Sequence, residues 1–205
     1  MSDFHRKKNE SANEGSKKPR QPKKLPKYLN EDEIELLLNT PYKFTNLHHI
    51  LMMKLGVICG LRGSEVIKLK KEDIDLERLQ IHVEEGKYSK DRIVTIPPSS
   101  TEFIKDLTKY LENINDSKQK VFGITTTSAL TQMVKRYAKH AGIKRNVNFH
   151  MLRHSHAVHS IRSGVNLRSV QKNLGHSSLS TTAIYLDVMA EDVKKDYRNH
   201  PLPFL

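Results

Sequence analysis

The segment LQIHVEEGKYSKDRIVTIP, residues 79–97, carries the one clear β signal of the chain. Two runs within it, 79–85 and 92–96, alternate apolar and polar residues, and a polar loop containing Gly86 joins them. Alternation of this kind places successive side chains on opposite faces of a strand. We therefore expect an antiparallel hairpin that ends at Pro97.

The rest of the ordered chain has helical periodicity. Asn30 is a predicted N-cap, because acidic residues and then apolar residues follow it. Further helices are predicted over 45–60, a short stretch through Glu65 and Leu69, 100–114, 127–142, 149–164, 166–175, 178–188 and 190–199. The predicted fold class is α+β, mainly α-helical, with a small antiparallel sheet.

Basic residues dominate the charge of the chain. The net charge is +12, and residues 1–29 hold nine Lys or Arg against three Asp or Glu. Such a balance indicates a polyanionic partner, with nucleic acid as the leading candidate. We expect 1–29 to be a basic disordered tail, either a solubilising arm or cloning remnant or a DNA-contacting arm, and 30–205 to be the folded domain.

Apolar stretches in the sequence are short. None reaches the length of a membrane span, and the polar N-terminus does not resemble a secretory signal. We expect a soluble cytoplasmic protein without a membrane partner. The single cysteine, Cys59, lies in an apolar run and is predicted to be a small buried hydrophobe.

Two arginines occupy apolar surroundings, Arg62 in VICGLRGSEV and Arg153 in HMLRHSHAV. A buried arginine is costly unless it is paired, and it cannot lose its proton. One interpretation is an internal ion pair, for example with Glu65 or Asp73. The other is a pair of guanidinium groups that bind the oxygens of a phosphate, a geometry that suits arginine.

Histidines gather in FHMLRHSHAVHSIRSG, residues 149–164. His150 and His154 have the i, i+4 spacing of a zinc helix, but the glutamate of HExxH is missing. No metal is therefore expected. His150 and Arg153 share a helical face and could converge on one phosphate. His154, His156 and His159 are predicted to be packing or helix-surface residues.

These segments together resemble the catalytic domain of the tyrosine recombinases, or phage-type integrases. The matching motifs, in family order and with family-like spacing, are GLRGSEV, EEGKYSKDRIVTIP, HMLRHSHA, LGHSS and TTAIYLDV. The resemblance covers residues 30–200. It implies a site-specific recombinase that cuts and rejoins double-stranded DNA through a covalent 3′-phosphotyrosine, without ATP, metal or other cofactor.

The resemblance also implies a role for each site residue. Tyr185 would be the nucleophile, while Arg62 and Arg153 would hold the non-bridging phosphate oxygens. His150 would assist proton transfer at the tyrosine, and His176 would donate a hydrogen bond to the phosphate.

Two further residues have implied roles beside this set. Lys87 would protonate the leaving 5′-oxygen, although Lys90 lies in the same loop. Glu65 would orient an arginine or a histidine from behind the site.

Some features depart from the family pattern. Phe149 stands where the family often has proline. About 29 residues precede the catalytic domain, too few for the family's N-terminal helical domain, so the chain is expected to be either a minimal enzyme or a piece of a longer one. The family implies a tetrameric homo-oligomer on DNA of the nucleoid, and 191–205 could dock in cis or on a neighbouring protomer.

Two other functions stay open at this point. A type IB topoisomerase shares the phosphotyrosine chemistry but would relax supercoils without pairing two sites. A non-catalytic basic DNA-binding protein would need no intact catalytic set. The resemblance favours recombination.

Overall fold

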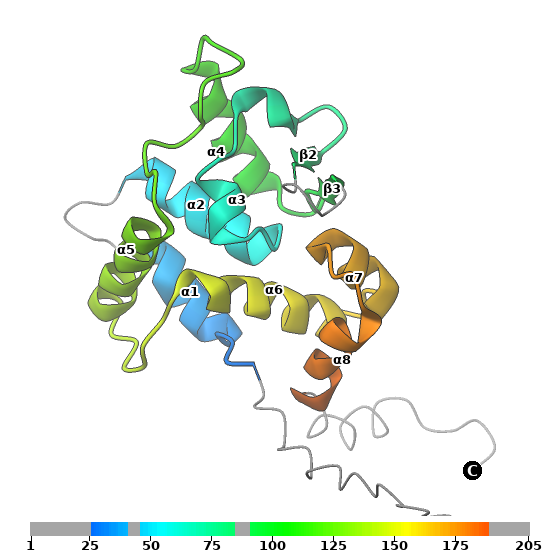
Figure 1. The fold of residues 1–205 in the computed structure, drawn as a ribbon. Coiled ribbons are helices and arrows are strands. Elements are labelled where there is room, and N and C mark those ends of the chain that lie inside the picture. Colours follow the sequence, from blue (N-terminus) through cyan, green and yellow to red (C-terminus); the bar gives the residue numbers. More distant parts are fainter. Residues whose placement is uncertain (1–25, 41–45, 85–90, 189–205) are drawn as a thin grey trace, which may run out of the picture.

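The computed structural model describes residues 26–40, 46–84 and 91–188. The elements in chain order are α1 (Glu31–Asn39), α2 (Leu47–Ile58), α3 (Gly63–Val66), the 3-10 helix Lys71–Asp73, β1 (Ile74–Asp75), β2 (Gln80–Val83), β3 (Arg92–Thr95), α4 (Thr101–Glu112), α5 (Thr127–His140), α6 (Phe149–Arg162), α7 (Leu167–Leu174) and α8 (Leu179–Val188). The fold is mainly α-helical, as predicted, and its small sheet lies at one side of the molecule, beside α4 and α7 (Figure 1).

The sheet contains the predicted hairpin and one additional strand. β2 pairs with β3 in antiparallel register, with Ile81 opposite Val94, and β1 pairs with the other edge of β2. Ile81 and Val94 are fully buried, whereas Ile93 on the opposite face is 47% exposed. Alternation predicted this division correctly. The two-residue β1 is too short to show any period.

The core is centred on α2, which is apolar on several faces. Leu51, Met52 and Leu55 are completely buried there. α6 packs against α2 and crosses beneath it in Figure 1. Burial of side chains of this size stabilises the fold by about 1.5–3 kcal/mol each. The α2–α6 pair is thus the rigid base to which the other elements attach.

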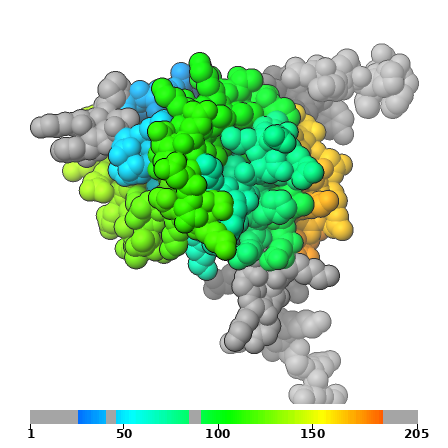
Figure 2. Space-filling model, turned by 90° about the horizontal axis from the view of Figure 1, so that it is seen from above, coloured from blue at the N-terminus to red at the C-terminus, as the bar shows by residue number. Residues whose placement is uncertain are grey.

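A second, smaller apolar cluster joins α6 to α7 and α8. It is formed by Ala157, Val158, Val170, Leu174 and Tyr185. α7 also contacts β3, and Figure 2 shows the α7 surface at the edge of the face that α4 and the 64–84 region cover. α7 therefore lies between the sheet on one side and α6 and α8 on the other.

Polar caps define several helix ends. The predicted cap Asn30 forms a full capping box with Glu33, which confirms where α1 begins. Asn148 caps α6 and Asn166 caps α7 in the same way, through side-chain oxygens that accept backbone N–H bonds. α7 ends at Gly175, whose φ of 68° lies in the left-handed region. The turn that follows carries His176.

Candidate active site

A pocket of about 460 Å³ opens between α6 and α8. Four of the six predicted catalytic residues line it, namely His150, Arg153, His176 and Tyr185. Arg62 borders a neighbouring pocket on the side of the sheet. The sixth, Lys87, lies outside the described residues, as do Lys90 and the predicted helix over 190–199.

Arg153 is the most deeply buried cation of the site, with 1% of its surface exposed. Its Nη1 donates to the carbonyl of Gly60 at 2.6 Å, and its Nη2 donates to the carbonyl of Leu174 at 2.5 Å. Burial and then the nearby charge of Arg62 lower the pKa of Arg153 to about 10. The guanidinium therefore stays charged at neutral pH while it links the turn between α2 and α3 to the end of α7.

Arg62 forms the internal ion pair that the sequence left open. Its Nη1 donates to Oε1 of Glu65 at 2.8 Å, and its backbone N–H donates to Oε2 at 2.7 Å. The alternative partner, Asp73, instead accepts the backbone N–H of Lys70. A third of the Arg62 side chain, 34%, remains exposed, so pairing with Glu65 leaves part of its surface accessible to a ligand.

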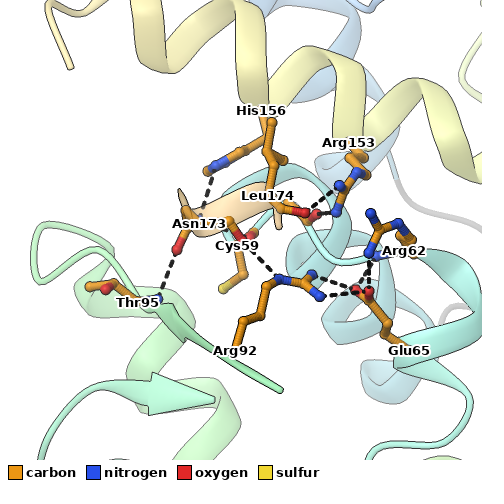
Figure 3. Close-up of polar contacts among 10 residues, drawn as sticks. Cys59, Arg62, Glu65, Arg92, Thr95, Arg153, His156, Asn173 and Leu174 are labelled. Atoms are coloured by element: carbon orange, nitrogen blue, oxygen red, sulfur yellow. Dashed lines mark hydrogen bonds and ion pairs between the residues drawn. The ribbon is translucent and has the colours of Figure 1, made fainter. Parts of the chain in front are cut away.

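Glu65 binds a second arginine that the sequence reading did not single out. Nη1 and Nη2 of Arg92 donate to the two carboxylate oxygens, each at 2.9 Å, and both side chains are almost fully buried (Figure 3). Burial works to raise the pKa of Glu65, but the hydrogen bonds and charges of Arg92 and Arg62 lower it below its ordinary value. Glu65 is thus held as a carboxylate between two guanidinium groups.

Tyr185 points into the pocket but is only 3% exposed. Its hydroxyl lies 2.8 Å from Nδ1 of His154, within hydrogen-bonding distance. Burial raises the pKa of the phenol, and the charge of Arg153 acts in the opposite direction. Removal of its proton therefore needs an acceptor and a positive charge nearby.

His154, predicted to be a packing or helix-surface residue, instead contacts the hydroxyl of Tyr185. Burial, followed by the charges of His150 and Arg153, lowers its pKa to about 4. At neutral pH it is an uncharged imidazole whose Nδ1 can accept the Tyr185 O–H. Its i, i+4 spacing from His150 was the available signal, because that spacing places both rings on one face, and their centroids lie 4.4 Å apart.

The other two pocket histidines are also uncharged at neutral pH. Burial, then Arg153 and Arg62, lower the pKa of His150. The pKa of His176 falls to about 4 through burial and then the charges of Arg153, Arg62 and Arg92. The Nδ1 of His176 bonds with the Thr182 hydroxyl at 2.9 Å, which fixes the ring. Both imidazoles can donate one N–H bond to an anion.

His156 and His159 have the structural surroundings expected of them. His156 is 8% exposed and its Nδ1 contacts the Val57 carbonyl at 3.3 Å. Nε2 of His159 lies 2.8 Å from the Leu29 carbonyl. Cys59 is fully buried, as predicted, and burial raises the pKa of its thiol far above the usual value.

Asn173 is another residue that the sequence reading missed. Its Oδ1 accepts the Thr95 backbone N–H at 2.9 Å, and its Nδ2 donates to the Cys59 carbonyl at 3.2 Å. An asparagine near a helix end carries no distinctive sequence signal, since such residues are common at helix termini.

The described residues hold neither a metal-binding cluster nor a membrane-spanning helix. No three His, Cys, Asp or Glu side chains in that part of the chain are grouped so that they could hold a metal ion. Over the same ranges, no helix combines the length and apolar character that crossing a bilayer requires.

The sequence is similar to those of known proteins. The model of the phage integrase family matches residues 27–192. The tyrosine recombinase XerA of Thermococcus onnurineus is 40% identical over 186 residues, which cover 86% of this chain and 64% of that protein. XerD of Staphylococcus aureus is 36% identical over 197 residues, covering 89% of this chain and 65% of XerD.

Solved structures agree with these relatives. A crystal structure of XerA recombinase superposes with a TM-score of 0.75 at 30% identity, covering 91% of this chain and 68% of that one. The XerH recombinase bound to a palindromic difH substrate, in a post-cleavage complex, gives a TM-score of 0.69 at 26% identity, covering 84% and 53%.

The chain spans a little under two thirds of the length of the curated relatives that it matches. The family model matches most of its residues, and the elements that carry the pocket lie within that match. The chain belongs to the phage integrase family.

Proposed function

We propose that this protein is a site-specific DNA recombinase that breaks and rejoins one strand at a time through Tyr185. The observation that carries the proposal is the shared pocket of Tyr185, Arg153, His150 and His176. A phenol nucleophile, a buried guanidinium and two neutral N–H donors are suited to bind and attack one phosphodiester.

The proposed reaction starts with attack of the Tyr185 oxygen on the phosphorus. The bond from phosphorus to the 5′-oxygen breaks as the phosphotyrosine forms at the 3′ end, and Lys87 gives that leaving oxygen its proton. Arg62 and Arg153 stabilise the charge on the pentacoordinate phosphorus, and His176 donates to a non-bridging oxygen. Groups of this type contribute about 10²–10³-fold in rate each.

Rejoining reverses these steps. A 5′-hydroxyl attacks the phosphotyrosine and releases Tyr185, so the bond energy is conserved and no ATP is needed. In both directions His150 assists proton transfer between the Tyr185 oxygen and Nδ1 of His154, which lie 2.8 Å apart, and Glu65 orients Arg62. The ion pair between Arg62 and Glu65, at 2.8 Å, supports the second of these roles.

Double-stranded DNA is the proposed substrate. The net charge of +12 supports it, and the structural relatives include XerH bound to difH and a dimer of λ integrase bound to a core site. Neutralisation of phosphates makes such binding strongly salt-dependent. We further propose that recombination takes place in a tetramer of this chain on nucleoid DNA in the cytoplasm.

A covalent adduct tests the function. Duplexes that bind the Tyr185→Phe variant are selected from a random-sequence pool, nicked to trap the intermediate, and incubated with wild-type protein. A denaturing gel should show a shifted protein–DNA band for wild type and none for Tyr185→Phe. Tyr137→Phe is the matched control, because Tyr137 is also 3% exposed but lies on α5.

Two results would contradict the proposal. A band of equal intensity with Tyr185→Phe would show that another residue is the nucleophile. Relaxation of a supercoiled plasmid that carries no selected site, at the same rate as one that does, would instead indicate a topoisomerase.

A further inference from the structure

The groups proposed to bind phosphate come from three separate elements. Arg62 caps α3, Arg153 lies on α6, and His176 lies in the turn after α7. Catalysis by positioned groups depends on their spacing, and a displacement of about 1 Å can cost about 10²-fold in rate. Contacts between these elements must therefore fix the spacing.

Arg92 makes contacts on both sides of this arrangement. Its Nη atoms bind both oxygens of Glu65, the residue that also binds Arg62. Its Nε donates to the backbone carbonyl of Asn173, at 3.1 Å, one residue before the end of α7. Figure 3 shows its guanidinium between Glu65 and the end of α7.

The side chain of Asn173 extends the same set of contacts. It accepts the N–H of Thr95, at the end of the strand that Arg92 begins, and it donates to the carbonyl of Cys59. Leu174, next to it, gives its carbonyl to Arg153. The end of α7 is therefore tied to β3, to the α2–α3 turn and to α6.

The ion pair between Arg92 and Glu65 is buried, which restricts its geometry. The side chains of Arg92 and Glu65 are 8% and 9% exposed. A charged pair that is forked, buried and hydrogen-bonded has one favoured geometry, and removal of one partner leaves the other uncompensated. Arg92 lines neither of the two pockets that contain the residues predicted to bind phosphate.

We infer that Arg92 is a positioning residue of the recombinase site: through Glu65 and Asn173 it fixes the distance between Arg62 and the His176 turn. The expected effect of Arg92 on the reaction rate rests on the proposed function. The structural link that Arg92 makes between α3 and the end of α7 does not depend on that function.

The experiment compares Arg92→Lys with wild type. Lysine keeps the charge but cannot bind both oxygens of Glu65 and the Asn173 carbonyl together. We expect the rate of adduct formation at saturating DNA to fall about 10²-fold. The Kd for the selected duplex should change less than about threefold, because the Arg92 side chain is only 8% exposed and lines neither pocket. Arg78→Lys is the control, since Arg78 pairs with Asp75 at the surface.

If Arg92 only stabilised the fold, Arg92→Lys would not change the rate of adduct formation per folded molecule. All variants are assayed well below their unfolding temperature, and the rate is expressed per folded protein. An unchanged rate in folded Arg92→Lys would overturn the inference. Asn173→Ala tests the same link from α7 and should slow adduct formation without weakening binding. The increase in activation free energy of the double variant should be smaller than the sum of the two single increases, because both substitutions break the same link.

Backbone NMR separates this inference from the proposed function. Without DNA, Arg92→Lys should shift amide signals both around Arg62–Val66 and around Asn173–His176. Shifts confined to β3 and its strand neighbours would overturn the link, whatever the enzyme does. If wild type forms no adduct while both regions shift, the proposed function fails and the structural link holds.

Discussion

At the residue scale, three histidines of the pocket are uncharged for the same physical reason. Burial is the main cause: with His150 and Arg153 it lowers the pKa of His154 to about 4, and with nearby arginines it lowers that of His176 to about 4 and that of His150 as well. A neutral imidazole can donate one hydrogen bond and accept another without adding charge beside Arg153. The site therefore concentrates its positive charge in arginines, which binding of a phosphate would offset.

The hydrogen bond between His154 and Tyr185 leads to a first prediction. His154→Leu removes the acceptor 2.8 Å from the phenol and should slow adduct formation about 10²-fold, the size of a proton-transfer contribution. His154→Asn places an oxygen near the position of Nδ1 and should recover part of the rate. Single-turnover assays with the nicked duplex measure both. Equal rates for the Leu variant and wild type would mean that the contact does not serve the reaction.

The two arginines should differ in their effect on stability. Arg153→Met leaves the carbonyls of Gly60 and Leu174 without their donor, and each unsatisfied buried group costs about 1–3 kcal/mol. Arg62→Met affects a side chain that is 34% exposed and leaves Arg92 on Glu65, so a loss below about 1 kcal/mol is expected. Urea unfolding at pH 7.5 measures the difference. A smaller loss for Arg153→Met than for Arg62→Met would contradict the assigned contacts.

At the element scale, the turn between α2 and α3 places Arg62. Gly60 has a φ of +70°, and a Cβ added there would lie 2.6 Å from Cδ2 of His156. The chain reverses within three residues after α2 and presents Arg62 as the N-cap of α3. Close packing of this turn against α6 thus brings the two arginines to one side of the molecule.

This packing predicts an unequal cost for two similar substitutions. Gly60→Ala and Gly142→Ala both force a left-handed φ on alanine, which costs about 1–2 kcal/mol. Only Gly60→Ala also meets a neighbour, because nothing lies within 4 Å of a Cβ at Gly142. Gly60→Ala should therefore lower the free energy of unfolding more, and should also reduce the rate of adduct formation. Equal decreases in the free energy of unfolding, measured with urea, would show that α6 shifts to accommodate the added methyl group.

At the scale of the whole molecule, buried histidines couple folding to pH. His154, His156 and His176 have pKa values of about 4 in the folded protein, against an ordinary value of 6.5. Between these values the unfolded chain binds more protons than the folded one. The stability that they contribute is complete above pH 6.5 and is lost as the pH falls toward 4.

Urea unfolding between pH 6.5 and 5 tests this coupling. His156, which is 8% exposed, should account for a loss of about 2 kcal/mol over that range. The transition midpoint should fall steadily with pH, and His156→Asn should reduce the slope. A midpoint that does not change with pH would show that these imidazoles are more accessible to protons than their burial implies.

The confirmed predictions depended on local patterns. Alternation over 79–96 identified β2 and β3, and Asn30 before an acidic turn identified the start of α1, because period and capping act within a few residues. β1 was not predicted, since two residues show no period. The role of Arg92 was equally hidden, because its partners on α3 and α7 are distant in the chain.

By itself, the sequence determined most of the helices that the structure describes, the hairpin, the basic charge and, through motif order and spacing, four residues that share one pocket. Only the tertiary structure decided which histidine contacts Tyr185, which carboxylate binds Arg62, and what holds α3 and α7 in place. The reason is physical. Periodicity and caps depend on neighbours in sequence, whereas hydrogen bonds of buried ions depend on neighbours that packing of α2, α6 and the sheet brings together.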